Sequence, residues 1–117
     1  MDVEERSDAA AARVAAAIGE PSRARMLFTL MDGRARTSTE LAALAAVGAP
    51  TASAHLQRLR TAHLVEVQPQ GKHRYYTLAG AGVAAALEAL SVLAGGDARP
   101  AFRGTRAVPS RLRAARS

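Results

Sequence analysis

The sequence contains no cysteine and no tryptophan. Without cysteine the chain cannot form a disulfide, bind a metal through thiolates or use a thiol nucleophile. Aromatic residues make up only 3% of the 117 residues, whereas hydrophobic residues make up 49%. The core must therefore consist of Ala, Leu, Val and Met side chains, each of which buries a modest area. Because a single domain built in this way is only marginally stable as a monomer, we expect it to dimerise.

Long apolar runs and a secretion signal are also missing. No segment reaches the roughly 20 apolar residues that a membrane-spanning helix requires. The first eight residues, MDVEERSD, are acidic and lack the basic and apolar regions of a signal peptide. The sequence thus predicts a cytoplasmic protein with no membrane partner.

Motifs for catalysis are absent as well. None of the three histidines lies in a nucleophile or acid–base motif, no paired carboxylates are placed to face a pocket, and no Gly-rich phosphate loop is present. We therefore expect that the protein is not an enzyme.

The positive charge is concentrated near the end of the chain. The net charge is +6, and residues 95–117 contribute six arginines and one aspartate, a net +5. This segment has little apolar surface to bury, so we predict that it is disordered. Such an arm would either add nonspecific attraction to DNA or only increase solubility. We accordingly divide the chain into one domain, residues 1–94, and an Arg-rich tail, residues 95–117.

Local signals predict two helices at the start of the domain. The first covers residues 7–18, with Ser7 or Asp8 as its N-cap. The second begins at Pro21, where the missing N–H of proline costs nothing, and is closed by Asp32-Gly33.

Two further helices follow, separated by a tight turn. Thr37 and Glu40 have the spacing of a capping box at the start of the third helix. Its predicted buried face consists of Leu41, Leu44 and Ala45. Residues 47–50 form the turn, and the fourth helix runs from Thr51 until His63. A short helix, a Gly-containing turn and a second helix are typical of a helix-turn-helix.

After Leu64 the apolar period changes from 3.6 to 2, which indicates strands. Residues 65–68 and 72–78 are the two predicted strands, and residues 69–71 are the turn between them. A last helix over residues 81–94 is stopped by two glycines. Its predicted apolar face consists of Val83, Leu87, Leu90 and Leu93 or Ala94. The predicted fold is therefore mainly α with a small β-hairpin, a winged helix-turn-helix.

Residues 13–94 resemble the ArsR/SmtB family of bacterial regulators. The resemblance is carried by the segments EPSR (20–23), TELA (39–42), TASAHLQRL (51–59) and GKHRYYTL (71–78). It implies a homodimer, joined through the first and last helices, that binds a palindromic operator in double-stranded DNA and regulates transcription under the control of a ligand. The sensor sites of metal-binding relatives do not carry over, because the third helix has no ligand and only Glu88 and Asp97 are available near the last helix.

The fourth helix begins with small polar side chains, which is the pattern of a recognition helix. Bulky apolar residues in its first turn would hold the helix away from base edges in the major groove. Thr51 and Ser53 can bond bases or phosphates, Gln57 suits bidentate reading of adenine, and Arg58 suits a phosphate. The predicted DNA contacts are Thr51, Ser53, Ala54, His55, Gln57 and Arg58 of the helix, and Lys72 and Arg74 of the hairpin. Taken alone, Thr51 and Ser53 are more typical of capping residues of a surface helix. The helix-turn-helix and the basic hairpin around them favour the DNA-contacting interpretation instead.

The histidines admit structural and functional interpretations. His55 is expected at the boundary between the core and the DNA backbone, where a structural or phosphate-contacting role is favoured over metal ligation. His63 stands where relatives usually have Gly, and His tolerates the positive φ of a helix end. If Gln68 pairs with His73, then Glu66 is the diagonal neighbour of His73. His63, Glu66 and His73 are therefore a candidate site for nickel or zinc.

An alternative function is a winged-helix interaction module that acts through a regulatory protein partner, with DNA binding secondary. The two functions differ at Thr51, Ser53 and Gln57. Changing these residues to Ala weakens specific DNA binding only if they read bases.

Overall fold

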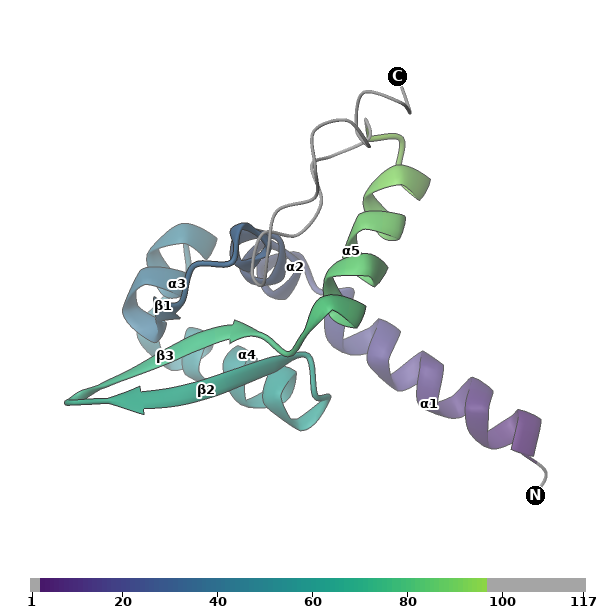
Figure 1. The fold of residues 1–117 in the computed structure, drawn as a ribbon, viewed down its shortest axis with the longest axis horizontal. Coiled ribbons are helices and arrows are strands. Elements are labelled where there is room, and N and C mark those ends of the chain that lie inside the picture. The colour runs from purple at the N-terminus through teal and green to yellow at the C-terminus, as the bar shows by residue number, and fades with distance from the viewer. Residues whose placement is uncertain (1–2, 97–117) are drawn as a thin grey trace.

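The computed structural model describes residues 3–96, which form five α-helices, one short 3₁₀ helix and a three-stranded antiparallel sheet (Figure 1). The elements are α1 (Val3–Ile18), α2 (Pro21–Thr29), η1 (Leu30–Asp32), β1 (Arg36–Thr37), α3 (Ser38–Ala45), α4 (Ala49–Thr61), β2 (Val65–Gln70), β3 (His73–Leu78) and α5 (Ala81–Leu93). The predicted disordered tail lies outside the described residues from residue 97 onward.

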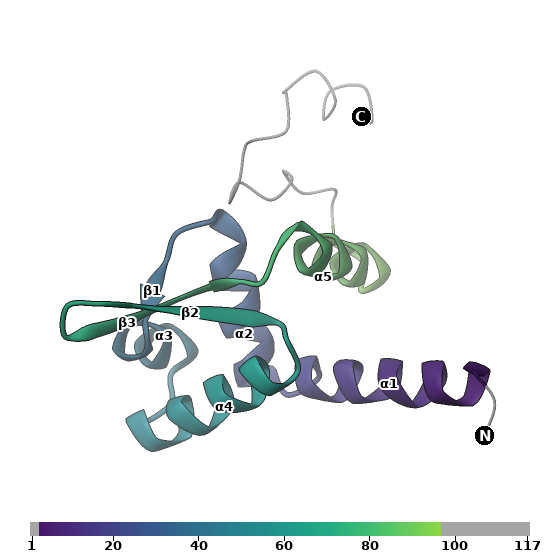
Figure 2. The same ribbon diagram turned by 60° about the horizontal axis from the view of Figure 1, so that its bottom comes forward.

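The first helix begins earlier than its capping signals predict. α1 starts at Val3, so Ser7 and Asp8 lie inside the helix and the predicted N-cap is wrong. No residue between Val3 and Asp8 breaks a helix, and acidic residues in a first turn favour helix formation through the helix dipole. α1 projects away from the rest of the domain (Figures 1 and 2). Among residues 7–18 of α1, whose burial the structure describes, only Ala17 and Ile18 join the core.

The predicted starts of α2 and α3 are confirmed. Pro21 is the first residue of α2, and the carboxylate of the N-cap Glu20 accepts a hydrogen bond from the backbone N–H of Arg23 at 2.9 Å. At α3 the Thr37 hydroxyl accepts from the Glu40 N–H at 3.1 Å, and the Glu40 carboxylate accepts from the Thr37 N–H at 2.8 Å. This reciprocal pair is a capping box.

The sheet has one strand more than predicted. Its order is β1-β3-β2, and the two-residue strand β1 pairs Arg36 with Tyr76 and Thr37 with Tyr75. A strand of two residues is too short to show a period, so the sequence contains no signal for it. Tyr75 and Tyr76 face opposite sides of β3, since Tyr76 is buried and Tyr75 is half-buried.

One apolar core joins all the layers. The largest fully buried side chains come from α2 to α5 and are Met26, Leu27, Leu30, Leu41, Leu56, Leu59 and Leu87. None of the helices formed by residues 3–96 is both long and apolar enough to cross a bilayer.

Two predicted apolar faces are only partly buried. On α3, Leu41 and Ala45 are buried but Leu44 is 45% exposed, because Leu44 lies beside the buried stripe rather than on it. On α5, Leu87 is buried whereas Leu90 and Leu93 are 42% and 83% exposed. α5 thus contributes its first half to the core of this chain and leaves apolar side chains of its second half uncovered.

Candidate nucleic-acid interface

α3 and α4 form a helix-turn-helix whose turn is closed by backbone hydrogen bonds. Ala46 ends α3 with a φ of 58°, and the N–H of Val47 donates to the carbonyl of Ala42 at 3.0 Å. α4 then begins at Ala49, two residues earlier than predicted, with Pro50 in its first turn. Pro50 therefore belongs to the helix rather than to the turn, a position that proline tolerates because the first N–H groups of a helix have no intrahelical partner.

α4 packs one face on the core and leaves the other open. Its buried residues are Ala52, Leu56 and Leu59. The exposed residues include Thr51, Ser53, Ala54, Gln57 and Arg58. At 100° per residue, Ala54, Gln57 and Arg58 point most directly away from the core. The open face of α4 therefore carries small side chains near its amino-terminal end, followed by the amide of Gln57 and the guanidinium of Arg58.

The hairpin of β2 and β3 carries two basic side chains at the end of the molecule where α4 begins. Its tip and the amino-terminal end of α4 lie at the same end of the molecule in both views (Figures 1 and 2). The tip is a two-residue turn at Gly71 and Lys72, with Gly71 at a φ of 63°. Lys72 and Arg74 are exposed. Two positive charges therefore lie at the hairpin tip, where they suit contacts with the phosphate backbone of a nucleic acid.

His55 is the predicted contact residue that the structure places differently from its neighbours. Its side chain is 15% exposed and faces the start of α2. Its Nδ1 atom lies 3.3 Å from Nη1 of Arg23, and its Nε2 atom lies 3.4 Å from a carboxylate oxygen of Glu20. The structural interpretation of His55 is thus favoured over a phosphate contact.

Arg23 joins this cluster to α1, a connection for which the sequence has no local signal. Its Nε donates to the carbonyl of Ala17 at 2.6 Å, and its Nη2 donates to the carbonyl of Ala16 at 3.2 Å. The hydrogen bond from the backbone N–H of Arg23 holds the pKa of Glu20 below its usual value. Because 32 residues separate Arg23 from His55 in sequence, no periodicity could reveal their contact.

The hairpin register differs from the predicted one. Gln70, not Gln68, pairs with His73, and Glu66 pairs with Thr77. His73 and Glu66 lie on the same face, as predicted, but four residues apart along β2, or about 13 Å. The predicted diagonal contact between them is therefore wrong, because β2 continues through Pro69 to Gln70 and the turn lies at Gly71 and Lys72.

The predicted metal site does not form. The register separates Glu66 from His73, and His63 lies before the start of β2. Among the residues that the structure describes, no three His, Asp or Glu side chains come together in a group that could hold a metal ion. The proposed His63/Glu66/His73 ligands for nickel or zinc are thus not supported by the geometry.

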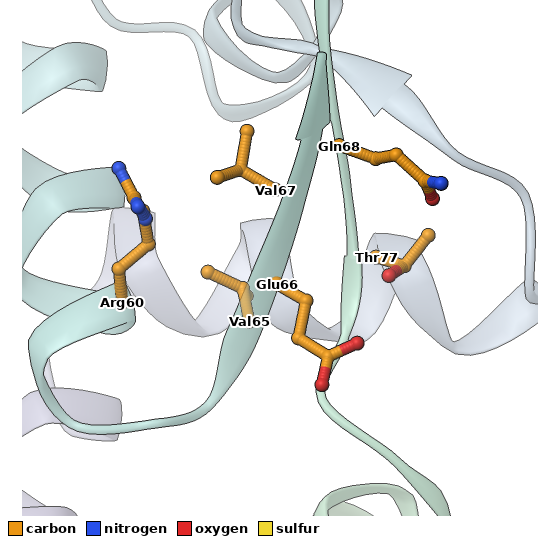
Figure 3. Close-up of a pocket in the computed structure, with 6 residues that line it drawn as sticks. All are labelled: Arg60, Val65, Glu66, Val67, Gln68 and Thr77. Atoms are coloured by element: carbon orange, nitrogen blue, oxygen red, sulfur yellow. The ribbon is translucent and has the colours of Figure 1, made fainter.

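A hollow of about 520 Å³ lies along β2. Its lining residues are Arg60, Val65, Glu66, Val67, Gln68 and Thr77. Figure 3 shows Val65 and Val67 on the side of β2 that faces Arg60, with Glu66 on the other side. The guanidinium of Arg60 and the carboxylate of Glu66 therefore lie on opposite sides of β2, which is not the arrangement of an acid–base pair.

The residue that terminates α4 has the backbone conformation expected from the sequence. His63 has a φ of 61°, so histidine occupies the left-handed position that usually favours glycine. The prediction of a positive φ at His63 is confirmed.

Comparison with known proteins agrees with this geometry. The family model described as a helix-turn-helix domain matches residues 18–68. The uncharacterized HTH-type transcriptional regulator YdfF of Bacillus subtilis is 43% identical over 79 residues, which cover 68% of this chain and 35% of YdfF. The present chain therefore spans about a third of the length of that relative.

Solved structures show the same fold. The homodimeric winged helix-turn-helix DNA-binding domain of Mb0332 from Mycobacterium bovis, a possible ArsR-family transcriptional regulator, has a TM-score of 0.72 and 30% identity. The match covers 81% of this chain and 87% of that domain. Reduced HlyU from Vibrio cholerae has a TM-score of 0.70 and 27% identity, with 80% and 97% of the two chains covered.

Proposed function

Because the chain belongs to the ArsR family of winged helix-turn-helix transcriptional regulators, we propose that it regulates transcription by binding operator DNA as a homodimer. α4 is the recognition helix and the β2–β3 hairpin is the wing. The single observation that carries the proposal is the open face of α4, which is exposed from Thr51 to Arg58 while the opposite face is anchored in the core.

The exposed side chains suit distinct contacts with a duplex. The amide of Gln57 can donate to and accept from adenine in the major groove. Thr51 and Ser53 lie in the first turns of α4, where hydroxyls and backbone N–H groups bind phosphates or base edges. Arg58 is suited to a phosphate, since its guanidinium is long and exposed.

The wing supplies a second point of attachment. Lys72 and Arg74 flank the exposed hairpin tip and are suited to the DNA backbone beside the groove that α4 enters. Contacts of this kind fix the orientation of a protein on the duplex without reading sequence. They also make the affinity depend on salt concentration.

Dimerisation is supported by apolar side chains that this chain leaves uncovered. Val14 of α1 is 38% exposed, and Leu90, Val92 and Leu93 of α5 are between 42% and 83% exposed. The similar Mb0332 domain is homodimeric. A two-fold dimer would present two copies of α4 to successive major grooves of a palindromic site.

A selection of random duplexes by the purified protein tests this function and yields an operator sequence. Thr51→Ala, Ser53→Ala and Gln57→Ala should each weaken binding to that operator by about 1–3 kcal/mol and relax its sequence preference. Thr39→Ala, an exposed position on α3 outside the open face of α4 and the proposed dimer surfaces, is the matched control and should leave the affinity unchanged. If no duplex is enriched, or if all three variants bind the operator like the wild type, the proposal is wrong and a protein partner becomes the better explanation.

A further inference from the structure

We propose that Arg23 and His55 are positioning residues that connect α1 to the recognition helix and set the orientation of α4. This inference rests on the proposed function, since orientation matters through DNA binding. It assigns to His55 an indirect role in place of the direct DNA contact that its place in the recognition segment predicts.

The connection runs through one guanidinium. Arg23 donates to the carbonyls of Ala16 and Ala17 at the carboxyl end of α1, and its Nη1 faces Nδ1 of His55 on α4 at 3.3 Å. The last carbonyls of a helix have no intrahelical partner, so they are natural acceptors for this cation. Arg23 therefore links α1 directly to the middle of the recognition helix.

The partners of His55 determine its protonation pattern. Arginine can only donate hydrogen bonds, so the Nδ1 atom that faces Arg23 must accept one. The ionised carboxylate of Glu20 can only accept, so the Nε2 atom that faces it must carry the proton. Both contacts are satisfied together only by the neutral imidazole with its proton on Nε2.

The location of the cluster explains why it would affect DNA binding. His55 lies between Ala54, which is exposed on the open face, and Leu56, which is buried in the core. A rotation of α4 about its axis would move His55 away from Arg23 and turn Thr51 and Gln57 away from the groove. Leu56 and Leu59 hold α4 against the core through apolar contacts, which are non-directional. The hydrogen bond to Arg23 adds direction to that packing.

Two substitutions of His55 separate its two contacts. Asparagine places a polar atom near the position of Nδ1, so His55→Asn can still meet Arg23. Glutamine places a polar atom near the position of Nε2, so His55→Gln can still meet Glu20. If the link to Arg23 orients α4, His55→Asn should bind the selected operator within about twofold of the wild type, and His55→Gln should bind about tenfold more weakly.

Arg23→Met tests the other half of the link and should also weaken operator binding about tenfold. Arg25→Met is the matched control, since Arg25 lies on the same helix with its side chain exposed, and should bind like the wild type. A scrambled duplex of equal length should be bound equally by all these variants. Equal losses on both duplexes would instead mean that the residue contacts the backbone itself, and would overturn the proposal.

Nitrogen NMR of the free protein tests the geometry without DNA. Imidazole ¹⁵N shifts of neutral His55 should report the proton on Nε2 in the wild type, and Arg23→Met should abolish this preference. A proton on Nδ1 in the wild type would overturn the link even if operator binding is strong. Failure to enrich any duplex, with the Nε2 proton present, would instead count against the proposed function. Melting curves identify any folding defect in Arg23→Met. If that variant is defective, the comparison of His55→Asn with His55→Gln still tests the link.

Discussion

The backbone N–H of Leu64 donates to the carbonyl oxygen of Leu59 at 2.9 Å, and this bond closes the carboxyl end of the recognition helix. The N–H of His63 donates to the carbonyl of Arg60, also at 2.9 Å. The two bonds together form a Schellman motif, in which the residue before Leu64 must be left-handed. Leu59 and Leu64 are both buried, so the same motif directs the chain from α4 into the wing.

His63 occupies that left-handed position with a side chain, and we predict that His63→Gly stabilises the protein. A non-glycine residue at a φ of 61° carries a steric cost that glycine avoids. The gain should be about 0.5–1 kcal/mol in urea denaturation, part of it offset by the greater freedom of glycine in the unfolded chain. His73→Gly, at the start of strand β3, should destabilise. A loss of stability in His63→Gly would show that the imidazole makes a stabilising contact.

The capping box at α3 should contribute measurably to stability. Thr37→Ala removes the hydroxyl that accepts from the Glu40 N–H, and we expect a loss of about 1 kcal/mol by thermal or urea unfolding. Thr39→Ala, an exposed position two residues later, should change stability by less than about 0.5 kcal/mol. Equal effects of the two changes would argue that the cap contributes nothing beyond helix propensity.

The ion pair between Asp32 and Arg36 predicts a pH dependence. Two nitrogens of Arg36 lie 2.9 Å from the two carboxylate oxygens of Asp32, and the hydrogen bonds from Arg36 hold the pKa of Asp32 below its usual value. A carboxylate with a lowered folded pKa stabilises the fold above its unfolded pKa, and this stabilisation is lost as the pH falls through the folded pKa. Asp32→Asn should therefore be less stable than the wild type at pH 7, and the difference should shrink below about pH 4.

Screening by solvent limits the difference in stability between Asp32→Asn and the wild type. The Asp32 side chain is 40% exposed, so the loss in Asp32→Asn at pH 7 should be under about 1 kcal/mol. Melting temperatures at pH 7 and pH 3 measure it. A difference that grows on acidification would contradict the assignment.

Dimerisation should depend on the uncovered half of α5. Leu93→Glu places a charge where an 83% exposed leucine is proposed to meet a second copy of the chain, so the dimer dissociation constant should rise at least about tenfold. Sedimentation or light scattering across a concentration series measures the change. Ala81→Glu, at the exposed start of the same helix, should leave the dimer intact. A Leu93→Glu protein that still dimerises like the wild type would place the interface elsewhere.

Much of the fold was predictable because its signals are local. The capping box of Thr37, the proline that starts α2 and the buried stripe of α4 each depend on residues within one or two turns. The positive φ of His63 also follows from its place at a helix end. The exposed set on α4, from Thr51 to Arg58, could be predicted because burying one face of a helix exposes the other.

The remaining features arise from distances in space that sequence spacing does not encode. The register of the hairpin depended on which residues form the turn, and pairing His73 with Gln70 instead of Gln68 moved His73 away from Glu66. β1 exists only because β3 offers it a pairing edge. The contact of Arg23 with His55 joins α2 to α4, although the two residues are 32 positions apart in the sequence.

The sequence by itself determined which segments are helical, which face of each helix is apolar and that this chain contains no thiol, because these depend on residue type and short-range period. Only the tertiary structure decided that His55 turns toward Arg23 and Glu20 and that the predicted metal ligands lie apart. The physical reason is that hydrogen bonds and metal coordination require atoms within a few ångströms. Such proximity depends on how the elements pack.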